Sequence, residues 1–574
     1  MMKKLLYIIA AGALIMSVSC SKLLDTDNMF DKSLETFYKS PQDINEAMGG
    51  VYNALYVNGV FSEEHLTANL LSDCMLAGGG PDDVTAKWVD GFEDPLTDTY
   101  KDLWVQTYNG VYRANAIIEA VENTDFSSYF YTEDEANTFK TNTIGEAYFM
   151  RGFMMYRAAR FFGGMPLIPT SDAPRDVPRA SFTETFGMIA DDFIKAAELL
   201  PVISAGTISP EEYGHANKWA AKAYIARTYM FYTGYMTNIE KQSTDVLALS
   251  DGGILTKADA VAHLDDIKAQ SGYALVSDFR NLWPYSYVNT SAGSVVLPWA
   301  DDQGLEWVGQ DGPNSPIGTG NNEVIFAKRF AFGNWGWDEG PKYNNRVPLF
   351  FGIRSNSLVP FAEGWGWGPV HPQLWNQWDD TDPRKEGSIL VLGDANQATD
   401  GYSSPNNWDH ETGYMNKKYV TLQHDGADGN AGMFYYLYSS TNNDMQLWHA
   451  QDFYYLRYAD ILLMHSELTE TPDGINEVRA RAGLGSVGYT IDNLKAERLY
   501  EFAFEGLRWF DLVRWGDVEN AGNNFYGTAA DVTNSGGVSA VYTMSYRAET
   551  KGLLPIPESE VQLSNGLYNQ NPGW

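Results

Sequence analysis

Four charged residues near the C-terminus have the types and spacing that proton transfer would require. They alternate in sign at every third position: Glu505, Arg508, Asp511 and Arg514. Side chains three residues apart lie on one face of a helix, so each could reach the next. A carboxylate beside a guanidinium could act in acid–base catalysis, but such ladders more often neutralise themselves within a helical core. We therefore predict a structural role for this set.

The element that must position these charges is one long helix over residues 497–516. Its apolar residues recur at roughly helical spacing, and Gly516 follows the last of them. Such a stripe predicts an amphipathic helix. Glycine is common just beyond a helix end because it adopts the left-handed conformation without strain. We expect Gly516 to end the helix.

Motifs of familiar enzyme classes are absent from the sequence. It contains no His-Glu-x-x-His, no Gly-x-Ser-x-Gly and no P-loop, and its eight histidines are scattered. Asp425, Asp428 and Asn430 could ligate calcium, but they miss the EF-hand spacing and are interpreted as an ordinary acidic turn. The sequence therefore predicts no catalytic residue, no metal ion and no cofactor.

Two Trp-Gly-Trp units are the strongest candidates for ligand binding. Trp335 and Trp337 form one, Trp365 and Trp367 the other, and both lie in polar, glycine-rich surroundings. A flat indole face can pack on the C–H face of a sugar ring, while fixed polar groups reach its hydroxyls. The alternative is that these rings pack a loop-rich region into the core. We predict that at least one unit is exposed.

Four further residues complete the predicted ligand-binding set. Trp283 and Tyr285 flank a proline that stiffens them. Trp88 and Asp73 belong to residues 72–95, whose glycines, prolines and acids predict a long loop. Long ordered loops are uncommon unless they are functional. We expect this loop to complete an aromatic platform within residues 283–378.

Amphipathic patterns predict a mainly α-helical scaffold. In residues 99–122, large apolar residues repeat at threes and fours. Ser181 and Glu184 form a capping box, and Asn217 is a predicted N-cap. Successive pairs of such helices are typical of tetratricopeptide-like repeats. The helices are expected over 42–58, 99–122, 144–162, after Ser181, after Asn217, and over 452–469, 475–483 and 492–515.

Helical periodicity fades between residues 283 and 450, where glycine, asparagine, proline and tryptophan dominate. We interpret 283–450 as a loop-rich ligand-binding elaboration inserted into the scaffold, because helices resume after it. The predicted organisation is a signal peptide over 1–19 and a single domain over 20–574. Within that domain, 20–282 and 451–574 are the helical parts.

The N-terminus resembles the leader of a lipoprotein. Lys3 and Lys4 precede an apolar run from Leu5 to Val18, which is short for a transmembrane span. Cys20 follows a small residue directly after this run, although Ser17 stands where many lipoboxes have leucine. We predict lipidation at Cys20 and stable anchoring by several acyl chains. The alternative is a soluble secreted protein cleaved nearby.

Charge and cysteine content exclude several classes. The formal net charge is −34, and loss of Lys3 and Lys4 with the leader would make it more negative. Nucleic acid needs cationic contacts to its phosphates, so it is not an expected partner. Cys74 has no second cysteine to pair with once Cys20 is lipidated, which excludes a disulfide framework.

Five stretches in order along the chain resemble the SusD/RagB family, the surface glycan-binding lipoproteins of Bacteroidetes. They are IGEAYFMRGFMMYRAARFFGGMPLIP (144–169), DDTDPRKEGSIL (379–390), YLRYADILLMHSEL with INEVRARAGL (455–468, 475–484), ERLYEFAFEGLRWFDLVRWG (497–516) and LLPIPESEVQLSNGLYNQNPGW (553–574). The resemblance implies a helical scaffold with four tetratricopeptide-like repeats. It also implies a non-catalytic protein on the outer membrane, facing the cell exterior, that captures an oligosaccharide or polysaccharide and delivers it to a SusC-like TonB-dependent transporter.

Two other functions stay open at this point. One is a secreted glycoside hydrolase, because the same aromatic features serve such enzymes. The other is a peptide-uptake receptor of the same fold. No motif in the sequence identifies a particular sugar.

Overall fold

Helices supply most of the regular structure in the part of the chain that the computed structural model describes, residues 37–209, 212–289, 295–296, 298–309, 321–330, 343–426, 429–432 and 449–574. The helices are α2 (Pro41–Asn53), α3 (Glu64–Leu70), α4 (Val84–Asp90), α5 (Lys101–Asn123), α6 (Glu133–Phe162), α7 (Phe182–Leu199), α8 (Lys218–Asn238), α9 (Lys257–Gln270), α10 (Pro298–Asp302), α11 (Val347–Phe351), α12 (Pro372–Gln377), α13 (Pro383–Ser388), α15 (Tyr458–Thr469), α16 (Asp473–Arg481), α17 (Ile491–Phe502), α18 (Arg508–Trp515) and α19 (Glu558–Leu563).

The strands of the described residues are short and pair two by two. All pairs are antiparallel except β6 with β7. The pairs are β1 (Val246–Ala248) with β2 (Ile254–Thr256), β3 (Val288–Asn289) with β4 (Val295–Val296), β5 (Val324–Lys328) with β12 (Phe453–Arg457), β6 (Ile353–Arg354) with β7 (Glu363–Gly364), β8 (Ile389–Val391) with β9 (Tyr414–Asn416), β10 (Gln423–Gly426) with β11 (Gly429–Gly432), and β13 (Ala529–Asn534) with β14 (Val538–Thr543).

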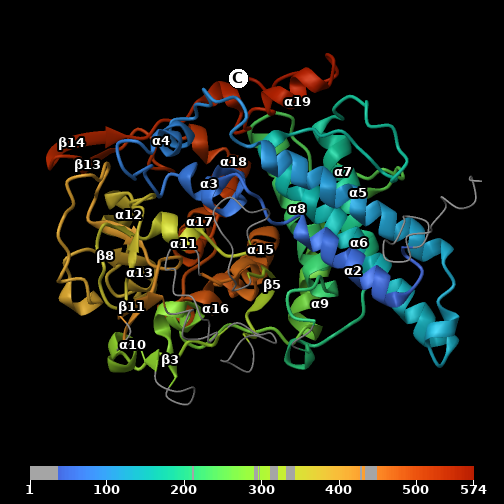
Figure 1. The fold of residues 1–574 in the computed structure, drawn as a ribbon, viewed down its shortest axis with the longest axis horizontal. Coiled ribbons are helices and arrows are strands. Elements are labelled where there is room, and N and C mark those ends of the chain that lie inside the picture. The colour runs from blue at the N-terminus through green and yellow to red at the C-terminus, as the bar shows by residue number, and fades with distance from the viewer. Residues whose placement is uncertain are drawn as a thin grey trace, which may run out of the picture.

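The long helices α5 to α9 stand together on one side of the molecule, and the short elements of the middle region lie on the other (Figure 1). Each of these helices packs on the next along the chain, which confirms the predicted scaffold of helix pairs. Gly152 of α6 permits close packing, because a β-carbon there would lie 2.9 Å from Asp192 Cβ of α7. The pairs therefore share a continuous apolar core.

Local signals placed the helix ends well. Ser181 and Glu184 form the predicted capping box at α7, and Asn217 Oδ1 accepts the backbone N–H of Ala220 at the start of α8. Gly163 follows α6 with φ +76°, so the helix ends at Phe162, the predicted last residue. The start of α6 was placed too late, because a second capping box at Thr132 begins the helix at Glu133.

Two predicted elements need correction. Residues 72–95 are not wholly a loop, because they contain α4. The predicted helix over 452–469 begins as β12, which pairs with β5 and turns into α15 only at Tyr458. The β5–β12 pair joins residues on either side of position 450, so the middle region is fastened to the helices that follow it.

The predicted single helix over 497–516 is two helices, α17 and α18, with a break between them. Phe504 and Gly506 have left-handed backbone, with φ +67° and +74°. The side chain of Asn69 on α3 donates to Phe504 O (3.0 Å) and accepts from the Gly506 N–H (3.1 Å). These buried hydrogen bonds satisfy backbone groups that the broken helix leaves free. Gly516 ends α18 in the left-handed conformation, as predicted.

The charged ladder is buried and neutralised, but mostly by distant partners. Only Arg514 and Asp511 pair as expected, at 2.9 Å. Arg508 instead pairs with Asp73, and Glu505 pairs with Lys418 at 2.7 Å. The interpretation as structural ion pairs is therefore consistent with the burial of these groups, while the proposed sequence of neighbours along one face is wrong.

A dense ionic cluster joins three parts of the chain beside this break. Arg457, at the end of β12, binds Glu501 (2.9 Å) and Glu505 (2.8 Å), and also Glu323. Arg384 of α13 lies 3.1 Å from Glu501 as well. These side chains are at most 1% exposed. Because each buried charge has an opposite neighbour, the cluster fixes the middle region against α17.

No helix within the described ranges combines the length and apolar character needed to cross a membrane. The same ranges hold no group of three or more histidine, cysteine, aspartate or glutamate side chains arranged to bind a metal ion.

Candidate functional site

Two segments far apart in the sequence run antiparallel and form one unit. Residues 74–79 lie along residues 366–371, joined by isolated bridges between Met75 and Val370 and between Gly78 and Trp367. Backbone hydrogen bonds of 2.8–3.0 Å fasten the strip, including Gly79 N–H to Gly366 O. We call residues 74–91 together with 353–371 the junction. It brings the loop and one Trp-Gly-Trp unit, both singled out from the sequence, into contact.

Three charged side chains of the junction, together with Asp409 beside it, are partly open to solvent. Asp83 is 3.5 Å from Arg354 Nη1, and Lys87 Nζ donates to Asp409 Oδ2 at 2.6 Å. Each of these side chains is between 17% and 26% exposed. Asp83 also accepts the Gly80 N–H at 2.6 Å. Held in place in this way, they offer fixed hydrogen-bond donors and acceptors to a polar ligand.

The pKa values of Asp409 and Asp90 favour a role for this region in ligand binding over a role in proton transfer. Burial raises the pKa of Asp409, but hydrogen bonds from Lys87 and Ser535 outweigh it and lower that pKa to about 2. Burial raises the pKa of Asp90 to about 7, against hydrogen bonds from Tyr542 and the Ala77 N–H. Asp90 is only 2% exposed, so it does not meet a ligand. A general acid needs both a raised pKa and access to the leaving group.

Trp367 does not provide a platform, because neighbouring rings cover both of its faces. It is 5% exposed and lies between Phe61 at 5.2 Å and Phe350 at 4.7 Å, nearly parallel to each. Gly366, the residue before Trp367, permits close packing and does not leave the ring exposed. A β-carbon on Gly366 would lie 2.6 Å from Trp408 Nε1 and 2.7 Å from Arg354 Cβ. Our expectation for Trp367 is therefore corrected to a core role.

Trp365 and Trp88 are the predicted tryptophans that stay partly exposed in the described part of the junction. Trp365 meets Phe350 edge-on at 5.0 Å and Trp367 at 6.0 Å, which fixes the orientation of its ring. Trp88 lies on α4, one residue after Lys87. The two rings thus come from the two segments that the backbone strip joins.

Three other predicted ligand residues lie in the core. Trp283 and Tyr285 are fully buried; Trp283 packs on Tyr454 at 5.5 Å, and the Tyr285 hydroxyl donates to Gly387 O at 2.7 Å. Asp73 is also fully buried and accepts two hydrogen bonds from Arg508, at 2.9 and 2.8 Å. A buried ring or carboxylate presents no surface to a ligand, so these three are corrected to structural roles.

Several predicted positions lie outside the described residues. They include Cys20, Trp335 and Trp337, whose roles stay predictions. Asp428 also lies outside them, while Asp425 and Asn430 are register partners in the β10–β11 hairpin.

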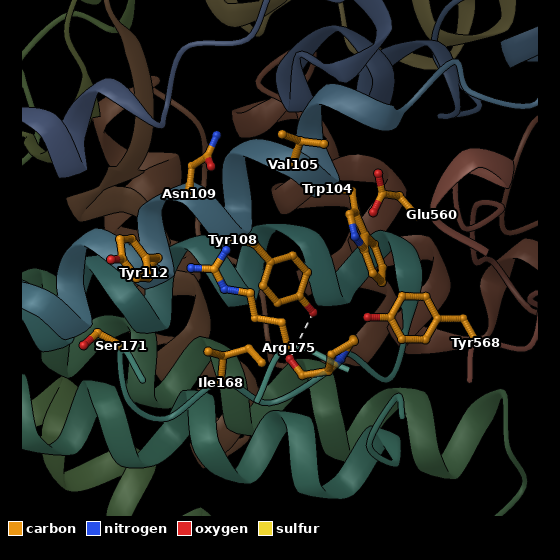
Figure 2. Close-up of a pocket in the computed structure, with 11 residues that line it drawn as sticks. Trp104, Val105, Tyr108, Asn109, Tyr112, Ile168, Ser171, Arg175, Glu560 and Tyr568 are labelled. Atoms are coloured by element: carbon orange, nitrogen blue, oxygen red, sulfur yellow. Dashed lines mark hydrogen bonds between the residues drawn. The ribbon is translucent and has the colours of Figure 1, made fainter. Parts of the chain in front are cut away.

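A pocket that the sequence did not single out opens beside the helical scaffold, with a cavity volume of about 420 Å³ (Figure 2). Trp104, Tyr108 and Tyr112 line it from α5, spaced four residues apart and therefore on one face of the helix. Arg175 approaches from the segment after α6, and Glu560 and Tyr568 come from the C-terminal segment. The four-residue recurrence of aromatics was the available signal, but it was interpreted only as a helical stripe.

Comparison with models of protein families identifies the family of this chain. A model described as "SusD family" matches residues 372–574, and one described as "Starch-binding associating with outer membrane" matches residues 22–230. Together they match well over half of the chain. The chain belongs to the SusD-like family. Its N-terminal match is to a model that describes starch binding and association with the outer membrane.

Relatives of this SusD-like protein match along nearly all of its length. SusD-like protein P2 of Formosa agariphila is 24% identical over 94% of each chain. A solved laminarin-binding SusD-like protein is 22% identical, covers 94% of this chain and all of its own, and superposes with a TM-score of 0.68. Surface glycan-binding protein A of Bacteroides thetaiotaomicron, solved with laminarihexaose, is 19% identical over 93% of this chain and all of its own, with a TM-score of 0.66. These structures share the SusD-like fold.

Proposed function

We propose that this SusD-like protein is a non-catalytic, cell-surface glycan-binding lipoprotein that captures an oligosaccharide at the junction. The observation that carries the proposal is the backbone strip that joins residues 74–79 to 366–371. It places partly exposed Trp88 and Trp365 on joined segments, beside charged side chains already held by their neighbours. An aromatic face with fixed donors and acceptors is what a sugar ring requires.

The names of the solved neighbours support a glycan as the ligand. One is described as laminarin-binding, and another was solved with laminarihexaose. Trp335 and Trp337 remain part of the proposed platform, together with Trp88 and Trp365.

Binding without hydrolysis is supported by the state of the acids at the junction. Asp409 is ionised because Lys87 and Ser535 stabilise its charged form. Asp83 lies beside Arg354 and accepts a backbone N–H. A glycosidase needs one carboxyl that keeps its proton as general acid and a second that acts as base or nucleophile. Asp409, which is ionised, therefore does not have the environment of the general acid.

The proposed location is the outer face of the outer membrane, through a lipid on Cys20. The family description of outer-membrane association supports this. Delivery of the captured glycan to a SusC-like TonB-dependent transporter is the step that follows from such a location, and it is part of the same proposal.

The test is a panel of neutral oligosaccharides, scored for binding by calorimetry and for new reducing ends. We expect binding without new ends, and we expect Trp88→Ala or Trp365→Ala to weaken it about thirtyfold, or about 2 kcal/mol. Trp375→Ala is the matched control, because this partly buried tryptophan stacks on Tyr414 outside the junction. New reducing ends would favour the hydrolase, and binding of peptides alone would favour the peptide receptor.

A further inference from the structure

The pocket beside α5 is built by three segments that are fastened to one another. Arg179 donates to Asn569 O (2.7 Å), Asn571 Oδ1 (2.8 Å) and Phe162 O (2.7 Å), which ties the segment after α6 to the C-terminal segment. The Tyr108 hydroxyl donates to Pro166 O at 3.0 Å and so fixes its ring. The walls are therefore held in place before any ligand arrives.

The C-terminal wall has its own attachment. At the start of α19, the Glu558 N–H donates to Thr97 O at 2.9 Å and the Ser559 N–H to Asp98 Oδ1 at 3.0 Å. These contacts place Glu560 over the start of α5. Tyr568 packs at 5.8 Å from Trp104, so the aromatic wall continues across the two segments.

Several polar groups that line the pocket make no hydrogen bond to the part of the protein that the structure describes, although the exposed Arg175 guanidinium lies 5.3 Å over the Tyr112 ring. Among the described residues, no hydrogen bond or ion pair engages the indole N–H of Trp104, the hydroxyl of Tyr568, the carboxylate of Glu560 or the guanidinium of Arg175. Trp104 is only 2% exposed, while Glu560 and Tyr568 are half-buried. Figure 2 shows Trp104, Tyr568 and Glu560 converging on one end, with Arg175 beside Tyr112 at the other. Donors and acceptors that no protein group engages can bind the hydroxyls of a ligand, so this end is suited to one.

We infer that this pocket is a second binding site, for one or two residues of a neutral saccharide. Tyr108 and Tyr112 follow each other at about 6 Å along α5, since four residues of helix rise by that amount, and the Arg175 guanidinium lies 5.3 Å over the Tyr112 ring. The unpaired indole, hydroxyl, carboxylate and guanidinium groups supply donors and acceptors at both ends for ring hydroxyls. A cavity of about 420 Å³ is within the range of small-molecule sites. The site uses no residue of the junction.

Charge and shape favour a neutral sugar over other ligands. An anion would meet the Glu560 carboxylate and the field of a chain with formal net charge −34. Burial, which is only partial, raises the pKa of Glu560 and outweighs the opposing effect of the Lys101 charge. An extended peptide would need a free strand edge, whereas the lining comes from helices and turns.

Two sites on one protein would change how it holds a polymer. A glycan bound at the junction keeps its remaining residues near the surface, so a second contact becomes intramolecular. The pocket would then strengthen the capture of long chains more than that of short ones.

The experiment measures calorimetric stoichiometry with laminarihexaose, maltohexaose and cellohexaose. We expect two sites for at least one probe, and loss of one site, or at least about tenfold weaker binding there, in Tyr112→Ala and in Glu560→Gln. Tyr112 is 40% exposed, so its removal leaves the core intact. The matched controls are Tyr129→Ala, a tyrosine that is 54% exposed elsewhere, and Glu558→Gln on the same helix.

The outcomes separate this inference from the proposed function. If only one site is observed, and Trp88→Ala abolishes it while Tyr112→Ala keeps it, the inference of a site in the pocket is wrong and the proposed site at the junction is retained. If only one site is observed, and only the pocket variants abolish it, the inference of a site in the pocket is supported and the proposed site at the junction is wrong. Absence of binding for all three probes, or binding in the pocket of peptides from a casein digest in place of sugars, overturns the inference.

Discussion

Removal of Arg508 should destabilise the fold strongly without touching the ligand. Its guanidinium makes two hydrogen bonds to Asp73, of 2.9 and 2.8 Å, and both side chains are at most 8% exposed. In Arg508→Ala the Asp73 carboxylate would stay buried, with only the Phe525 N–H at 3.1 Å and the Cys74 thiol as hydrogen-bond donors. Breaking a buried ion pair from one side costs about 3–5 kcal/mol of folding free energy.

The corresponding fall in melting temperature is small because the chain is long. Unfolding entropy is about 2.1 cal/mol/K per residue, or about 1.2 kcal/mol/K for the whole chain. A loss of about 4 kcal/mol therefore lowers the melting temperature by only about 3–4 °C when the chain unfolds as one unit. Urea denaturation, followed by circular dichroism, measures the free energy directly and is the better assay.

Two further variants make the test specific. Lys195→Ala breaks an ion pair of 3.1 Å whose side chains are more than half exposed, and should cost less than about 1 kcal/mol. Adding Asp73→Ala to Arg508→Ala should restore part of the lost stability, because the unpaired charge is then gone. The reasoning is refuted if Arg508→Ala costs no more than the surface control, or if the double variant is the least stable of all. A stable Arg508→Ala protein that no longer binds glycan would place this residue in the site.

Three other predictions address different parts of the molecule. The pKa of Asp90 is about 7 in the native state, above its unfolded value of about 3.8, so the native state holds an extra proton between these values and its stability falls as pH rises through them. Asp90→Asn should therefore be more stable than wild type by up to about 4 kcal/mol at about pH 8 and equally stable at about pH 4. Urea denaturation at the two pH values measures the difference. Trp367→Ala should lower the free energy of unfolding by about 3–5 kcal/mol and reduce glycan affinity less than Trp365→Ala, whose main effect should be on affinity; equal effects of the two variants on both quantities would contradict the assignment. Cys20→Ala should release the protein from the membrane fraction, and retention after a high-salt wash would exclude the lipid anchor.

Features encoded by neighbouring residues were predicted correctly. The capping box of Ser181 and Glu184 and the stop at Gly163 each depend on a few consecutive positions. Hydrogen bonds within one helix turn decide them, so the sequence contains the whole interaction. The same holds for the amphipathic stripes that produced the scaffold of helix pairs.

Features decided by distant partners were not predictable in this way. The helix expected over 497–516 is broken where the Asn69 side chain binds the backbone at Phe504 and Gly506. No residue near these two positions in the sequence indicates the break. Asp73 was predicted to bind ligand. Its actual partner, Arg508, is remote in the sequence, so the sequence did not indicate their ion pair. A single sequence shows which residues carry charge, but pairing between remote segments follows from the tertiary fold.

The two tryptophans of one Trp-Gly-Trp unit show why local composition does not determine exposure. Small neighbours were expected to leave both rings uncovered, yet the space beside Gly366 is filled by Trp408 and Arg354, which approach because glycine has no β-carbon. Trp367 is buried, and Phe61 and Phe350 stack on it. Trp365, two residues earlier, contacts Phe350 and Trp367 edge-on and stays partly exposed. The exposure of each ring in this unit therefore depends on rings from other segments, Phe61 and Phe350, and not on the glycine between the two tryptophans.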